Sequence, residues 1–150
     1  MKHYVEQTVY RFIKKNFSQK KGPLLLALSG GADSLALFYI LLKIRSWQNF
    51  DLYIAHVDHR WRDESGEEAL KLQRLAEEYK LPFHLKILKK MQGNVEEFCR
   101  DERLKFFNKL FIKYSMQAVL IGHHADDQAE TVLKRVFEGA SLSQLSSLKG

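Results

Sequence analysis

Two short stretches of the sequence gather residue types that bind phosphate groups and metal ions. The first stretch follows the apolar run Leu24 to Leu28 and consists of Ser29, Gly30, Gly31, Ala32, Asp33 and Ser34. Glycines let the backbone turn and let a ligand come close, and N–H groups at a helix start attract phosphate oxygens. A carboxylate such as Asp33 is repelled by phosphate unless a cation such as Mg²⁺ bridges the two. The stretch predicts a phosphate and Mg²⁺ site; a turn with Asp33 as a helix cap is the alternative.

The second stretch covers residues 122–131 and carries three acids. We expect a helix from about Ala125 to Glu138, with Asp126 and Asp127 in its first turn and Glu130 on the same side. A hard cation, an ammonium substrate or both would relieve the repulsion among carboxylates that crowd one helix end. Ordinary helix capping, which accounts for one or two of these acids, is the alternative.

Two adjacent histidines, His123 and His124, come just before these acids. Polar contacts to a nucleotide, or proton transfer near an attacked atom, suit imidazole side chains at this place. A zinc site is the alternative, but the sequence offers no convincing set of ligands with tetrahedral spacing. The one cysteine also excludes a site built from paired cysteines within these 150 residues.

A pair of arginines begins the inward stripe of a long helix expected over about Val95 to Tyr114. Arg100 and Arg103 share that stripe with apolar residues further along the helix. Inward arginines need anionic partners, and the guanidinium fork matches phosphate. The alternative is that both side chains reach solvent at the start of the helix.

A further polar cluster, His56 to Arg62, follows a predicted strand. His56 and Arg62 are candidates for substrate or phosphate contacts. Trp61, which lies between two arginines, would stack on a nucleobase or form part of the ordinary surface.

Strands and helices alternate along the chain. Residues 24–28, 51–57, 83–88 and 118–121 have the character of strands, and apolar residues recur at helical spacing between them. This alternation predicts an α/β fold, a parallel sheet with helices on both faces, because parallel strands need crossover helices. The polar clusters follow strands, so they meet at the edge where such folds bind ligands.

Composition narrows the class of protein. The 150 residues include 24 basic and 18 acidic side chains, a net charge of +6, which hints at a polyanionic partner. No apolar run approaches the roughly 18 residues of a membrane helix, so no membrane partner is expected. One cysteine and a polar N-terminus favour the cytoplasm.

These motifs resemble those of known enzymes. Ser-Gly-Gly-x-Asp-Ser between a strand and a helix resembles the PP-loop of the N-type ATP pyrophosphatases, which have a Rossmann-like, HUP-like fold. Residues 122–131 are similar to the Gly-His-His-x-x-Asp-Gln-x-Glu-Thr segment of the tRNA(Ile)-lysidine synthase family. Residues 94–103 are similar to that family's Asn-x-Glu-x-x-Ala-Arg-x-x-Arg segment, with Cys99 in place of the alanine. Residues 56–62 are similar to its His-Val-(Asp or Asn)-His-Gly-Leu-Arg stretch, with Arg60 and Trp61 in place of Gly-Leu.

The resemblance, which covers about Leu24 to Leu145, implies a two-step ligation. ATP adenylates the oxygen on carbon 2 of the first anticodon cytidine of a tRNA(Ile) with a CAU anticodon, and the ε-amine of free lysine then attacks carbon 2 and displaces AMP. It implies that the Ser29 to Ser34 loop binds ATP, that Asp33 and Asp127 hold Mg²⁺, and that Arg100 stabilises charge on phosphate. Glu130 would bind the lysine ammonium, helped by neighbouring acids, with His124 as a polar aid.

The same resemblance implies that residues 1–150 are an N-terminal PP-loop domain, truncated before the tRNA-recognition domains. A homodimer is left open. Three alternatives stay open for the activity: a tRNA thiolase of the same loop group, a domain that holds ATP without cleaving it, and a module that merely binds RNA. Thiolases of that kind commonly use paired cysteines, and this chain has one.

Overall fold

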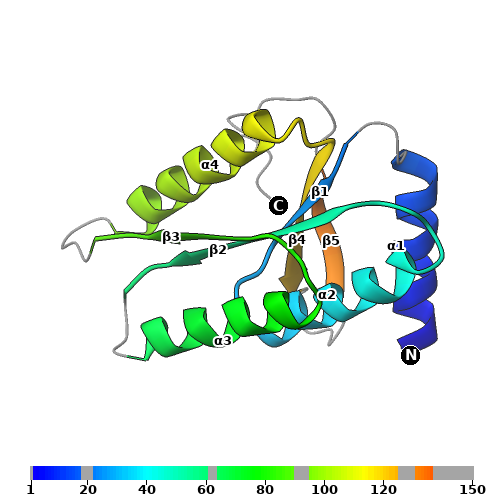
Figure 1. Ribbon diagram of the computed structural model, residues 1–150, viewed down its shortest axis with the longest axis horizontal. Coiled ribbons are helices and arrows are strands. Elements are labelled where there is room, and N and C mark those ends of the chain that lie inside the picture. The colour runs from blue at the N-terminus through cyan, green and yellow to red at the C-terminus, as the bar shows by residue number, and fades with distance from the viewer. Residues whose placement is uncertain (1, 18–21, 61–63, 90–94, 125–130, 137–150) are drawn as a thin grey trace.

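The alternating elements form a single five-stranded sheet flanked by helices (Figure 1). This computed structural model describes residues 2–17, 22–60, 64–89, 95–124 and 131–136, with side chains described within 6–17, 22–32, 34–60, 64–89 and 97–121. The elements are α1 (Lys2–Asn16), β1 (Leu24–Ala27), α2 (Ala32–Arg45), β2 (Leu52–Asp58), α3 (Ser65–Glu78), β3 (Phe83–Ile87), α4 (Val95–Lys113), β4 (Ala118–His124) and β5 (Thr131–Val136).

The strands lie in the order β3-β2-β1-β4-β5. The first four are mutually parallel, and Leu26 of β1 pairs with Ile54 of β2 on one side and Leu120 of β4 on the other. Helices α1, α2 and α3 lie on one face of the sheet and α4 lies on the other (Figure 1). The predicted parallel sheet with helices on both faces is confirmed.

Both faces of the central strands are apolar, as expected for parallel strands with helices on each side. Along β1, Leu24 and Leu26 face the cluster beneath α1, α2 and α3, whereas Leu25 faces α4. In β4, Leu120 belongs to the first cluster and Val119 to the second. The buried polar residues of β2, His56 and Asp58, lie near the carboxyl end of that strand, and the site is built at this end of the sheet.

Gly22 allows the backbone before β1 to lie close to the backbone before β4, at Ser115. Its φ of 114° lies in the region that favours glycine, and a Cβ there would collide with the carbonyl oxygen of Ser115. The Gln117 side-chain amide donates a hydrogen bond of 2.7 Å to the Gly22 carbonyl, and the Gln117 backbone N–H donates to Pro23. These bonds fix the start of β1 beside the start of β4.

The prediction of a helix from about Ala125 to Glu138 is wrong for Thr131–Val136. Residues Thr131–Val136 form β5, which pairs antiparallel with β4, His124 opposite Thr131 and Leu120 opposite Val136. Two physical reasons favour the strand: Thr131, Val132 and Val136 are β-branched, and β4 offers them an open edge with unpaired backbone groups. Residues 125–130 lie outside the described part of the chain.

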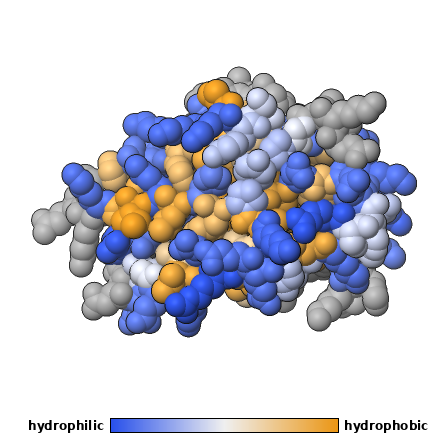
Figure 2. Space-filling view, viewed as in Figure 1, coloured by the Kyte–Doolittle hydropathy of each residue, from blue (hydrophilic) through white to orange (hydrophobic). Residues whose placement is uncertain are grey.

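Strand β3 forms the opposite edge of the sheet among the described elements. Leu85 and Ile87 are exposed there, and Figure 2 shows apolar side chains gathered along this strand between α3 and α4. Within the described residues no helix is long and apolar enough to cross a membrane.

Candidate functional site

The strand order creates a crevice at the carboxyl edge of the sheet. The connection from β1 to β2 runs through α2 on one face, and the connection from β3 to β4 runs through α4 on the other. Because β1 lies between β2 and β4, the two connections diverge beyond the carboxyl ends of β1 and β4. Open α/β sheets bind their ligands at such a switch point.

The predicted phosphate loop lies at this point, between β1 and α2. Gly30 has a φ of 91°, which a residue with a side chain rarely adopts. Gly31 is the N-cap residue of α2, and no side chain caps the helix there. The backbone N–H groups of the first helical turn therefore remain available to an anion, which the helix dipole also attracts.

Ser34 holds the loop together from inside. Its side chain is 2% exposed, and its Oγ accepts hydrogen bonds from the N–H groups of Ser29 (3.1 Å) and Gly30 (3.2 Å). The same hydroxyl lies 3.2 Å from the Gly31 carbonyl, to which it donates, and 2.9 Å from Ser29 Oγ. The loop is therefore shaped by its own serines, while Ser29, Gly31 and Ala32 are exposed at its surface.

His56 is placed beneath this loop rather than on its surface. The side chain is 6% exposed, and its Nδ1 lies 2.7 Å from the carbonyl oxygen of Leu28, the last residue before the loop. A carbonyl only accepts hydrogen bonds, so Nδ1 carries the proton in this contact. His56 therefore ties the end of β2 to the base of the loop.

Asp58 and Arg60 shape the turn after β2. One Asp58 carboxylate oxygen accepts a 3.0 Å hydrogen bond from the Arg60 N–H, and the other lies 3.5 Å from Arg60 Nε. Arg60 has a φ of 59°, a left-handed conformation that favours glycine. The family segment quoted above has glycine at the matching place, so this turn keeps a glycine-like backbone although the residue is arginine.

A cavity of about 540 Å³ opens between this edge and α4. Its volume lies in the range of small-ligand sites. Its polar lining comes from Ser29, His59 and Arg103, and its apolar walls are Ala27, Leu28, Ala55, Val57, Leu104, Phe107 and Ile121. An apolar cavity with an adjoining anion-binding loop suits a ligand that has a flat apolar part and a phosphate part.

Helix α4 places Arg103 at the wall of this cavity and Arg100 one turn before it. Arg100 and Arg103 are three residues apart on α4, and Arg100 Nε is buried without a hydrogen-bond partner among the described residues. The pKa of Arg103 is lowered, chiefly by burial and also by the Arg100 guanidinium, against a rise caused by Cys99. Part of the Arg103 side chain is nevertheless exposed, and a guanidinium stays protonated in proteins. An anion at this place would satisfy both groups.

His59, at the cavity wall, also senses these charges. Its pKa is lowered below 6.5, chiefly by burial and further by Arg103 and His56, while Asp58 raises it. The imidazole is therefore neutral at pH 7. His59 is a cavity residue that the sequence motifs did not predict, although a polar residue directly after a parallel strand is typical of such sites.

The structure brings together part of the predicted site. Ser29 to Ser34, His56 and Arg103 meet at one edge, with Arg100 on the same helix as Arg103. The backbone of Asp33 lies in the first turn of α2, and those of His123 and His124 end β4. The side chains of these three residues are not described, and four predicted residues lie outside the described part altogether: Arg62, Asp126, Asp127 and Glu130. No group of three His, Cys, Asp or Glu side chains that could hold a metal occurs among the described residues.

The chain is similar in sequence to proteins named tRNA(Ile)-lysidine synthase. The chain is 51% identical over 143 residues to the tRNA(Ile)-lysidine synthase of Protochlamydia amoebophila, which covers 94% of this chain and 31% of the relative. It is 44% identical over 133 residues to the tRNA(Ile)-lysidine synthase of Chlamydia muridarum, which covers 86% of this chain and 40% of the relative. The chain thus spans between 31% and 40% of the length of these two relatives.

A solved structure shares the fold. The U34-tRNA thiolase NcsA from Methanococcus maripaludis, solved with its [4Fe-4S] cluster, superposes with a TM-score of 0.64 at 22% identity. The match covers 84% of this chain and 47% of the thiolase. At this identity the likeness concerns the fold. The family model of the PP-loop domain matches residues 1–150, and the chain belongs to the PP-loop domain family.

Proposed function

We propose that this chain is the ATP-binding, catalytic part of a tRNA(Ile)-lysidine synthase. The observation that carries the proposal is the cavity beside the Ser29 to Ser34 loop, because it joins an anion-binding helix start to an apolar chamber lined by Arg103. The identity of 51% with a relative of that name supports this activity over those of other PP-loop enzymes.

ATP fits the two parts of the site. We place the adenosine in the apolar cavity and the phosphates against the first turn of α2, where the exposed Ser29, Gly31 and Ala32 surround the open helix start. Ser34 acts on ATP through the loop, because its hydroxyl is already bonded to the loop backbone. Arg100 and Arg103 then face the negative charge that develops on the attacked α-phosphate.

The proposed reaction has two steps. In the first, oxygen 2 of the first anticodon cytidine attacks the α-phosphate of ATP, and the bond to the β-phosphate breaks to release pyrophosphate. In the second, the ε-amine of lysine attacks carbon 2 of the adenylated cytidine, and AMP leaves with that oxygen. The amine loses a proton as it attacks, so a base is needed nearby. From their positions in the motif of residues 122–131, His124 and the acids of residues 126–130 are the candidates for this base.

Magnesium belongs to the proposal through its ligand chemistry. Asp33 and Asp127 would hold Mg²⁺, since one or two carboxylates together with substrate phosphates are its usual ligands. The donor set suits the ion in kind, because Asp33 is on the first turn of α2, beside the proposed phosphate site. Bound Mg²⁺ would neutralise charge on the phosphates. Glu130 and Asp126 are assigned to the lysine ammonium.

The thiolase alternative finds no support in the described residues. Cys99 is a buried free thiol on α4 and belongs to the apolar cluster between that helix and the sheet, so it has a packing role. Paired cysteines, which such thiolases commonly use, do not occur within these 150 residues, and this argues against the thiolase alternative.

AMP formation tests the proposal. The 150-residue chain and the full product of its gene are incubated with ATP, Mg²⁺, lysine and a tRNA(Ile) transcript with a CAU anticodon. We expect AMP and pyrophosphate release that requires the tRNA, and loss of that release in Asp33→Asn and Asp127→Asn with unchanged melting temperature. Release of ADP instead, or release that is indifferent to tRNA, contradicts the proposal.

A further inference from the structure

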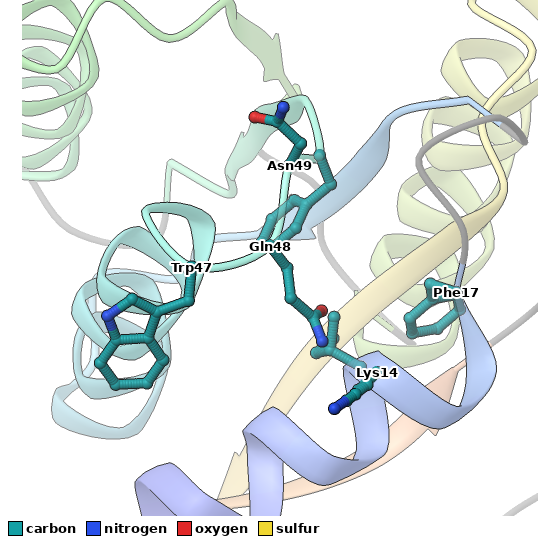
Figure 3. A pocket seen from close by; sticks show the side chains of 7 residues that line it. Lys14, Phe17, Trp47, Gln48 and Asn49 are labelled. Atoms are coloured by element: carbon teal, nitrogen blue, oxygen red, sulfur yellow. The ribbon is translucent and has the colours of Figure 1, made fainter.

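A second pocket lies at the other end of α2 from the Ser29 to Ser34 loop, between the end of α1 and the residues that follow α2. It has a volume of about 380 Å³, and Figure 3 shows its side chains. Ile13 and Phe50 form its buried floor, with exposed fractions of 1% and 8%. Lys14, Phe17, Trp47 and Gln48 form the walls. Because α2 runs from the phosphate loop to this pocket and has 14 residues, the two sites are about 21 Å apart.

The pocket carries an aromatic side chain that the fold leaves open. Trp47 is 57% exposed, although its ring meets Tyr10 edge to face at a centroid distance of 5.6 Å. In Figure 3, Trp47 and Phe17 lie on opposite sides of the pocket, and the Gln48 side chain reaches toward Lys14 between them. An indole held this way offers a preformed surface for stacking.

Cations surround this aromatic surface. The Nζ of Lys43 lies 5.8 Å from the centre of the Trp47 ring, and Lys14 Nζ lies 5.9 Å from that of Tyr10. The last turn of α1 contributes Lys14 and Lys15, and that of α2 contributes Lys43 and Arg45. None of the residues that line the pocket is acidic. Of the nearby acids, Glu6 is bonded to Lys43 at 2.9 Å, and Asp51 follows Phe50 as an exposed residue.

We propose that this pocket binds an unpaired nucleobase of an RNA strand, with Trp47 as the stacking platform and Lys14 as a contact to the adjoining phosphate. Aromatic rings beside positively charged side chains are the usual device for holding single-stranded nucleic acid. The charge favours RNA over an apolar or basic peptide segment. The inference rests on the proposed function in one respect, that the substrate is an RNA; it adds a second contact to that RNA, remote from the chemistry.

Binding of a fluorescent, unstructured 12-nucleotide RNA to the full gene product tests the proposal without ATP or lysine. An abasic 12-mer of the same charge is measured beside it. We expect Trp47→Ala to weaken RNA binding by about tenfold or more and to change abasic binding less than about twofold, because stacking needs a base. Trp47→Phe, which keeps an aromatic ring, should retain most of the affinity. Circular dichroism melts verify that each variant is folded.

Lys14→Glu supplies a second test that does not disturb the core, since Lys14 is exposed. We expect it to weaken binding of both oligomers, whereas Lys109→Glu, the same charge change at an exposed position of α4, should have a much smaller effect. Affinity for RNA that is equal in wild type, Trp47→Ala and Lys14→Glu overturns the proposal, as does equal loss of RNA and abasic binding in Trp47→Ala. If this test fails while tRNA-dependent AMP formation is intact, the proposed function stands and only the pocket assignment is overturned. If AMP formation also fails, both proposals are overturned.

Discussion

The imidazole of His56 and the carbonyl of Leu28, 28 residues apart in the sequence, lie 2.7 Å apart beneath the phosphate loop. The neighbouring backbone bond, from the N–H of Leu28 to the carbonyl of Ala55, has a length of 2.8 Å. Together they extend the pairing of β1 and β2 by one residue past the ladder. The loop that follows therefore starts from a fixed point.

Replacement of His56 should affect both stability and ATP use. In His56→Leu the buried Leu28 carbonyl loses its donor, and we expect a loss of about 1–3 kcal/mol in the free energy of unfolding. His56→Asn places an amide donor near the position of Nδ1 and should recover part of that loss. Urea denaturation and the Michaelis constant for ATP are measured on all three proteins. A His56→Leu protein with unchanged stability and ATP use contradicts this role.

The two loop glycines should respond differently to alanine. Gly31 has a φ of −73° and a Cβ there would lie 3.5 Å from Ser29 Oγ, an ordinary contact, so Gly31→Ala should cost at most about 1 kcal/mol of stability. Its methyl group would nevertheless stand on the exposed loop surface and should weaken ATP binding by about tenfold or more. Gly30→Ala should instead destabilise the fold by about 1–2 kcal/mol, because φ is 91°.

Gly66→Ala is the matched control for Gly31→Ala, since a Cβ at Gly66 meets nothing within 4 Å. We expect its ATP binding, measured by isothermal titration, to equal that of the wild type. ATP binding by Gly31→Ala at wild-type strength would show that the phosphates do not approach this part of the loop.

We expect Arg100 to lower the stability of the fold slightly and to strengthen ATP binding. Its Nε–H is buried without a hydrogen-bond partner among the described residues, and a buried unsatisfied donor costs stability. Arg100→Met should therefore leave the melting temperature equal to or a few degrees above that of wild type, at about 2–4 °C for each kcal/mol gained. Affinity for ATP should fall by about tenfold or more, the worth of a hydrogen bond to a charged group. A large drop in melting temperature would instead indicate that Arg100 is bonded within the protein.

The pH dependence of stability should carry a signature of His59. The folded-state pKa of His59 is lowered below 6.5, so near and below pH 6.5 the unfolded chain binds more protons than the folded one. His59 has no such effect above that range. As the pH falls through 6.5 its contribution destabilises the fold, and the loss is complete below the folded-state pKa.

Thermal melts at pH 7.5 and 5.5 check this sign. His59→Gln should lose less stability between the two pH values than wild type. His84, whose pKa is also lowered, chiefly by burial and also by Lys113, lies away from the cavity, and His84→Gln should remove a separate part of the same slope. An unchanged slope in both variants contradicts the assignment.

The fold was predictable because its pattern is local. The apolar run Leu24 to Leu28 predicts a buried strand from its own residues. The helical spacing of Ala69, Leu72 and Ala76, which are buried in α3, predicts a helix in the same way. Strand β5 was not predictable in this way, because Thr131–Val136 pairs with the open edge of β4, a property of the sheet rather than of the segment.

In the candidate site, too, features with a local sequence pattern were predictable and features that depend on the assembled sheet were not. Residue types and spacing predicted that the Ser29 to Ser34 loop lies between a strand and a helix and that Arg100 and Arg103 share one helix, as the structure has them. Their roles toward phosphate stay predictions. The inward role of His56 depends on a hydrogen bond across two strands, and the left-handed turn at Arg60 is hidden by a residue that rarely adopts it. Asp127 and Glu130 stay predictions from the sequence.

The most direct test of the central claim is transfer of labelled lysine to tRNA by the full product of the gene. Two tRNA(Ile) transcripts are compared, one with a CAU anticodon and one in which uridine replaces the first anticodon cytidine. The account predicts ATP-dependent label in the cytidine transcript, none in the uridine transcript, and none from Asp33→Asn. No label in the cytidine transcript, or equal label in both, would contradict it.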